Sequence, residues 1–109
     1  MEAMRIGSIV RLKPECREAY AALHANVWPA LLELFREYHV RNFTIFERDG
    51  FLFSYKEYTG TDYAGDMAEL CRHPLMREWF RLTDPCQERW PTAEPGALWA
   101  DGTIWFHMP

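Results

Sequence analysis

The sequence predicts an α+β fold whose elements follow the order β-α-β-β-α-β. Short segments rich in β-branched and aromatic residues have the two-residue period of a strand, and two longer stretches have the period of a helix. The dipeptide Asp49-Gly50, between two such short segments, is a strong signal for a β-hairpin. This order is that of a ferredoxin-like fold, in which helices cover one face of an antiparallel sheet.

The predicted strands are residues 5–12, 41–48, 51–58 and 103–107. In the first strand, Ile6, Val10 and Leu12 share one face with Ser8. The two hairpin strands carry bulky residues on both faces, although the helices can cover only one of them. Because an uncovered apolar face normally marks a partner surface, we expect a homodimer that packs sheet on sheet.

The first predicted helix runs from about residue 15 to residue 38, and Pro14 suits its first turn. Pro29 has no N–H group to pair with the Ala25 carbonyl, so the helix should bend near Ala25. A second helical region begins after a cap at Thr61 or Asp62 and ends at Arg72. His73-Pro74 then separates it from a further helical piece at residues 75–82, and a loop covers residues 85–102.

Composition and charge limit the possible functions. The 109 residues fit a single domain, 1–109, with a modest core, and the net charge of −4 includes no block of like charge. Nucleic-acid and membrane surfaces need clustered basic residues, so neither partner is expected. The N-terminus lacks the pattern of a signal peptide, which predicts a cytoplasmic protein. The spacings of the Cys and His residues fit neither a disulfide framework nor a metal site, so no metal is assigned.

His24 is the first candidate for a functional residue, because it lies on an apolar helix face with Tyr20, Val27 and Leu31. A single histidine in such a stripe is more often a core residue with satisfied hydrogen bonds. However, Tyr20 and His24 are four positions apart, so their polar atoms can converge on one point. The large aromatic residues have the same two interpretations, as core or as stacking faces for a sugar. They are Trp28, Trp79, Phe80 and Trp105.

Four motifs, taken in this order, resemble the L-rhamnose mutarotase family from the first strand to the last residue. No single motif would suffice, but their combination on a chain of this length is specific. The motifs are Tyr20-x-x-x-His24-x-x-x-Trp28-Pro29, Asn42-Phe43-Thr44-Ile45-Phe46, Trp79-Phe80 followed by Thr83-Asp84, and Phe106-His107-Met108-Pro109.

This resemblance implies an isomerase that interconverts the α and β anomers of L-rhamnose in the cytoplasm, without a metal or organic cofactor. It implies a dimeric ferredoxin-like α+β barrel, with His24 as the proton donor and Tyr20, Phe43, Trp79 and Phe80 as sugar-binding residues. The rhamnose enzyme has Tyr at position 43 and Trp at position 80, so two polar groups are missing here. The preferred monosaccharide is therefore open, whether L-rhamnose, another 6-deoxy-hexose such as L-fucose, or a different aldose.

Opening a hemiacetal ring requires general acid–base catalysis, which suits a histidine. The second proton-transfer group is left open between a water, a backbone group and Asp84. Two other classes of function also remain. One is a cofactor-free oxygenase or a heme-handling enzyme, because barrels of this type host both, and the other is a small-ligand-binding domain without catalysis.

Overall fold

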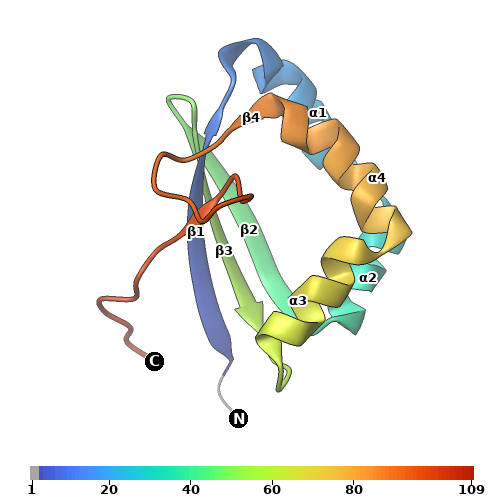
Figure 1. Cartoon of the computed structure of the whole chain (residues 1–109), viewed down its shortest axis with the longest axis vertical. Helices are drawn as coiled ribbons and strands as arrows, with labels where there is room; N and C mark the ends of the chain where they lie inside the picture. Colours follow the sequence, from blue (N-terminus) through green and yellow to red (C-terminus); the bar gives the residue numbers. More distant parts are fainter. Residues whose placement is uncertain (1–2) are drawn as a thin grey trace.

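The computed structural model describes residues 3–109, which form an antiparallel sheet with helices on one side (Figure 1). The three long strands are β1 (Met4–Leu12), β2 (Val40–Arg48) and β3 (Phe51–Tyr58), and two short ones are β4 (Gln87–Glu88) and β5 (Ala100–Asp101). The strand order is β2-β3-β1-β4, and β5 also pairs with β1. This is the sheet order of a ferredoxin-like fold, so the predicted fold class is confirmed.

The predicted hairpin joins β2 to β3 through Asp49 and Gly50. Both residues have positive φ, 54° and 83°, which is the backbone of a tight hairpin turn. Strand pairing then runs from Arg48 opposite Phe51 to Val40 opposite Tyr58. A register shift between Arg41 and Thr44 interrupts this ladder. The hairpin and β1 together build the face against which the helices lie.

The first predicted helix is in fact two helices, α1 (Arg17–Ala25) and α2 (Pro29–Glu37), preceded by a 3-10 turn at Pro14–Cys16. The sequence predicted a bend, whereas the structure has a complete break between Ala25 and Pro29. The cause is steric, because the proline ring disfavours helical backbone at the preceding residue, and Trp28 has extended dihedral angles of −58° and 129°. Pro29 then occupies the first turn of α2.

The second helical region matches its prediction. It contains α3 (Tyr63–Arg72) and α4 (Pro74–Thr83), followed by a 3-10 turn, η2 (Asp84–Cys86). The Asp62 carboxylate caps α3 by accepting a hydrogen bond of 3.1 Å from the Gly65 N–H. His73 separates the two helices and caps α4, since its Nδ1 accepts from the Leu75 N–H at 3.1 Å.

The prediction of a last strand at residues 103–107 is wrong. Residues 102–109 form no strand and extend away from the body of the molecule (Figure 1), and the edge of the sheet is built instead within the predicted loop. There β4 pairs with Arg11 and Leu12, while β5 pairs with Ser8 and Ile9. These short strands occupy the free edge of β1. The apolar pattern of the C-terminal segment could not reveal that competition.

The buried apolar residues form two separate clusters. The first joins the sheet to α1 and η2, and the second lies between α2, α3 and α4. The first contains Val10, Leu12, Tyr20, Leu52 and Cys86. The second contains Leu31, Leu34, Leu70, Met76 and Trp79. Within residues 3–109, no helix is long and apolar enough to span a membrane.

The helical cluster should contribute strongly to stability. Leu31 is completely buried on α2, whereas its neighbour Leu32 is 40% exposed. We expect Leu31→Ala to lower the free energy of unfolding by about 2–5 kcal/mol, because it removes packed methyl groups and leaves a cavity. The matched control Leu32→Ala should cost about 0.5 kcal/mol. Urea unfolding followed by circular dichroism would measure both, and equal costs would contradict this description of the core.

Candidate functional site

The site is built on one turn of α1, where Tyr20 and His24 stack with ring centroids 4.3 Å apart. His24 Nδ1 lies 2.9 Å from the backbone carbonyl oxygen of Tyr20. A carbonyl oxygen only accepts hydrogen bonds, so Nδ1 must carry the proton. Nε2 has no hydrogen-bond partner among residues 3–109. The neutral ring therefore presents an unprotonated Nε2.

The Tyr20 side chain is held by a buried hydrogen-bond chain. Gln87 Nε2 donates to the Tyr20 hydroxyl at 3.0 Å, and Trp99 Nε1 donates to Gln87 Oε1 at 3.1 Å. Gln87 and Trp99 were missed in the sequence, where both fall within the predicted loop. No motif or spacing marked them, because the contact between residues 20 and 87 exists only in the folded chain.

Burial strengthens the preference of Tyr20 for its neutral form. Its side chain is almost fully buried, and this loss of water raises its pKa from 10.0 to about 12. The phenol is therefore neutral at physiological pH. Its oxygen accepts from Gln87, while its own hydrogen meets no acceptor within residues 3–109. The hydroxyl thus remains able to donate one hydrogen bond to a ligand.

Two tryptophans complete this cluster. Trp79 of α4 packs edge-on against His24 with centroids 5.2 Å apart, and Trp28 packs edge-on against Trp79 at 5.1 Å. The predicted residues Tyr20, His24 and Trp79 therefore lie together, although they come from two helices. An imidazole, a phenol and an indole in contact can combine stacking with hydrogen bonding, which is the requirement for holding a small polar ring.

The other two predicted residues lie apart from this group. Phe43 is on β2, where its ring packs edge-on against Phe35 at 5.4 Å and is 42% exposed. Phe80 is half-buried and packs with the helical cluster. Within residues 3–109, no ring contact joins either of them to His24. Asp84 is exposed at the start of η2.

Comparison with known proteins gives the family. The family model described as L-rhamnose mutarotase matches residues 5–108. The chain belongs to the L-rhamnose mutarotase family. It is 32% identical to an L-rhamnose mutarotase from a Jannaschia species, over 92% of this chain and 93% of the relative. It is also 32% identical to one from Sinorhizobium fredii, over 82% of this chain and 85% of the relative.

Solved structures agree on the fold of this mutarotase-family chain. The crystal structure of an L-rhamnose mutarotase from Formosa agariphila has a TM-score of 0.78 and 18% identity, and covers 97% of this chain and 99% of that one. Tetracenomycin F2 cyclase from Streptomyces glaucescens has a TM-score of 0.72 and 20% identity, over 98% and 100% of the two chains. At these identities the likeness is one of fold. By its family the chain is a carbohydrate isomerase.

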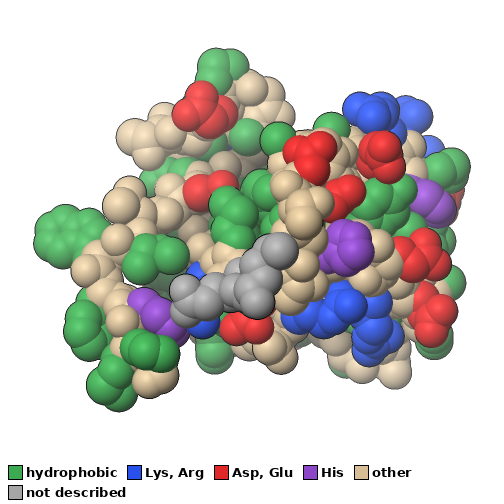
Figure 2. All heavy atoms as spheres, turned by 90° about the horizontal axis from the view of Figure 1, so that it is seen from below, with side chains coloured by type: hydrophobic (Ala, Val, Ile, Leu, Met, Phe, Trp, Pro, Cys, Tyr) green, Lys and Arg blue, Asp and Glu red, His purple; other side chains and the backbone are tan. Residues whose placement is uncertain are grey.

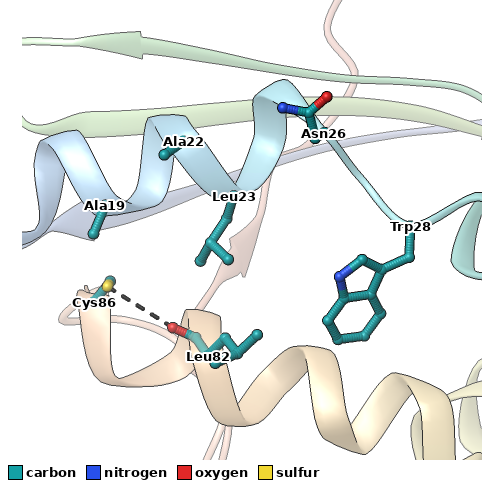
Figure 3. Close-up of a pocket in the computed structure, with 7 residues that line it drawn as sticks. All are labelled: Ala19, Ala22, Leu23, Asn26, Trp28, Leu82 and Cys86. Carbon is teal, nitrogen blue, oxygen red and sulfur yellow. Dashed lines mark hydrogen bonds between the residues drawn. The ribbon is translucent and has the colours of Figure 1, made fainter.

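A groove of about 540 Å³ on this family member lies between α1 and α4 and shares Trp28 with the aromatic cluster (Figure 3). It is lined by Ala19, Ala22, Leu23, Asn26, Trp28, Leu82 and Cys86. Its wall is mostly apolar, and neither Tyr20 nor His24 belongs to it. Because a sugar needs several hydrogen-bonding groups, we place the candidate site at Tyr20 and His24 and not in this groove. In the described part of the chain, no three His, Cys, Asp or Glu side chains converge as metal ligands would.

The burial of Tyr20 predicts a pH effect on stability in this family member. The folded pKa of Tyr20 is about 12, above the unfolded value of 10.0, so folding favours the neutral phenol. The contribution of Tyr20 to the free energy of unfolding, about 2–3 kcal/mol, is fully present below pH 10 and is lost as the pH rises to 12. We expect the Tyr20→Phe variant to lose less stability between pH 9 and 11.5 than the wild type in urea unfolding. Phe106→Leu changes an exposed ring that does not titrate and keeps all five tyrosines, so it should behave like the wild type, and equal losses in all three proteins would contradict the assignment.

Proposed function

We propose that this chain interconverts the α and β anomers of L-rhamnose or a related 6-deoxy-hexose, by general acid–base ring opening at His24. The observation that carries the proposal is the hydrogen bond from His24 Nδ1 to the Tyr20 carbonyl, which leaves Nε2 for proton transfer. Family membership supports the reaction class. We further propose that residues 1–109 act as one cytoplasmic domain without a metal or organic cofactor.

The proposed reaction uses both protonation states of His24. The imidazolium form carries a proton on Nε2 and delivers it to the ring oxygen, while the anomeric hydroxyl loses its proton to a second group. The bond between the anomeric carbon and the ring oxygen breaks, and a carbonyl forms at the anomeric carbon. Rotation about the adjacent carbon–carbon bond turns the other face of the aldehyde, and the reverse transfers close the ring. A histidine suits this sequence because it can both give and take a proton near neutral pH.

The neighbouring side chains have proposed roles in binding. Tyr20 donates its free hydroxyl hydrogen to a sugar oxygen, and Trp79 offers an indole face to the C–H groups of the sugar ring. Phe43 and Phe80 are proposed as apolar contacts at the edge of the site. Because both lack a polar group, a sugar with a methyl group at C6 suits them better than one with a further hydroxyl.

The first test replaces the proposed acid–base group. His24→Ala should lower catalysed anomer exchange by about 10²–10⁴-fold, the contribution of one positioned general acid–base group. Saturation-transfer NMR on L-rhamnose, L-fucose and common aldoses would measure it. His39→Asn is a matched control, because His39 lies at a positive φ of 67° that asparagine tolerates. Exchange by His24→Ala at the wild-type rate would exclude this role, and no exchange of any sugar by the wild type would favour a binding or oxygenase function.

We also propose that the chain forms a homodimer through the face of the sheet opposite the helices. That face exposes large apolar side chains, among them Phe46 at 61% and Phe53 at 41%. The C-terminal segment adds Ile104, Trp105, Phe106 and Met108, all exposed. Figure 2 shows hydrophobic side chains gathered on a projection at the left, the side on which the C-terminus lies in Figure 1. A two-fold pairing would bury both sheet faces at once, because such an interface is self-complementary.

The dimer predicts a particle of about twice the 12.9 kDa chain mass in light scattering at micromolar concentration. Phe46→Glu should shift the particle toward the monomer, because it places a charge in an apolar interface. The control Leu82→Glu introduces the same charge at an exposed position of α4 and should leave the dimer intact. A stable wild-type monomer would exclude the sheet-on-sheet assembly.

A further inference from the structure

The face of the sheet that points toward the helices carries polar residues in its middle, between Val10 and Leu52 on one side and the buried Val40 and Tyr58 on the other. In β1 and β3, Val10 lies opposite Leu52, and both are buried in the first cluster. The next inward pair is Ser8 opposite Ser54, and the one after it pairs Lys56 with Ile6. Two small hydroxyl side chains and a lysine therefore follow where packing alone would favour further large apolar residues.

Lys56 lies between aromatic rings from two other elements. Its Nζ is 5.9 Å from the ring centroid of Phe43 on β2 and 5.7 Å from that of Tyr63 on α3. Both distances are within the range at which an aromatic face attracts a cation. The ammonium is thus held beside Phe43, one of the proposed sugar-binding residues.

The charge of Lys56 is only weakly compensated by the protein. It forms no ion pair among residues 3–109. Burial lowers its pKa, and electrostatic interactions with Asp101 and Cys71 partly oppose this shift. Asp101 instead accepts a hydrogen bond of 2.6 Å from the Ser8 hydroxyl. Partial burial of an unpaired ammonium costs free energy. An oxygen of a ligand would offset that cost.

We propose that Lys56 is a further substrate-binding residue, whose ammonium donates a hydrogen bond to an oxygen of the sugar held beside Phe43. This inference rests on the proposed function and deepens it. An ammonium has three hydrogen-bond donors and no acceptor, so its ligand must offer an oxygen atom that accepts a hydrogen bond. Two sources fit, a hydroxyl of a neutral 6-deoxy-hexose and the carboxylate of a hexuronate, which is also a hemiacetal sugar.

Kinetics of anomer exchange test this role. Lys56→Met keeps most of the apolar stem against Phe43 and Tyr63 and removes the charge. We expect it to raise KM about tenfold with little change in kcat, which corresponds to about 1.4 kcal/mol of binding. Lys56→Arg keeps the charge and should restore part of the affinity. Lys13→Met is the matched control, because Lys13 is the other lysine of the sequence, and its KM should equal that of the wild type.

Comparing L-rhamnose with D-galacturonate identifies the acceptor. A larger KM increase for L-rhamnose points to a hydroxyl, and a larger one for D-galacturonate points to a carboxylate. Either result supports the proposal. An unchanged KM for both sugars in Lys56→Met, or a loss confined to kcat, would overturn it.

A second readout does not depend on catalysis. Reductive methylation with ¹³C-formaldehyde labels the two lysines and the N-terminus, and Lys13→Met and Lys56→Met assign the lysine signals. Adding L-rhamnose or D-galacturonate to the wild type should shift the Lys56 signal and leave Lys13 unchanged. A Lys56 signal that stays unshifted at saturating sugar would overturn the proposal even if Lys56→Met fails to fold. If the wild type catalyses no anomer exchange, the proposed function is wrong. The sugar titration alone then tests whether Lys56 binds a sugar.

Discussion

Tyr20 connects the core to the proposed chemistry, and several other contacts depend on it. Its ring is buried with Val10, Leu12 and Leu52, so α1 is fixed against the sheet at this point. Its carbonyl oxygen holds His24 Nδ1, and its hydroxyl accepts from Gln87. A single residue thereby sets the position of the helix, the tautomer of the histidine and the attachment of the segment that carries Gln87. Because these contacts share one anchor, displacing Tyr20 would disturb both the packing and the proposed proton transfer.

The division of the core into two clusters explains how a small domain can contain a polar site. If one continuous apolar core filled the space between sheet and helices, Ser8, Ser54 and Lys56 would be costly there. Instead, apolar packing is concentrated at the end of the sheet around Tyr20 and among α2, α3 and α4. The sheet positions next to Val10 and Leu52 carry the polar side chains, and the buried Ile6 and Tyr58 follow beyond them. Tyr20 and Trp79 thus belong both to the core and to the proposed site, whereas Ser8, Ser54 and Lys56 belong to neither cluster.

The sequence predicted the features that depend on local chemistry. Residue periodicity located the three long strands, Asp49-Gly50 located the hairpin, and Asp62 and His73 marked helix boundaries. The four-residue spacing of Tyr20 and His24 correctly indicated that they are neighbours. Features that depend on competition between distant segments were not predictable. The edge of β1 is taken by β4 and β5 and not by the C-terminal segment, and Gln87 meets Tyr20 only after folding.

The central claim is that the Tyr20 carbonyl fixes His24 with its proton on Nδ1, so that Nε2 is free for proton transfer to a sugar. Long-range ¹H–¹⁵N correlation spectra of the histidine rings test it most directly, with His24→Ala to assign the signals. We expect a protonated Nδ1 and an unprotonated Nε2 in the neutral ring, and a change at Nε2 when L-rhamnose is added. A His24 ring that carries its proton on Nε2, or an Nε2 signal that does not respond to any hemiacetal sugar, would contradict it.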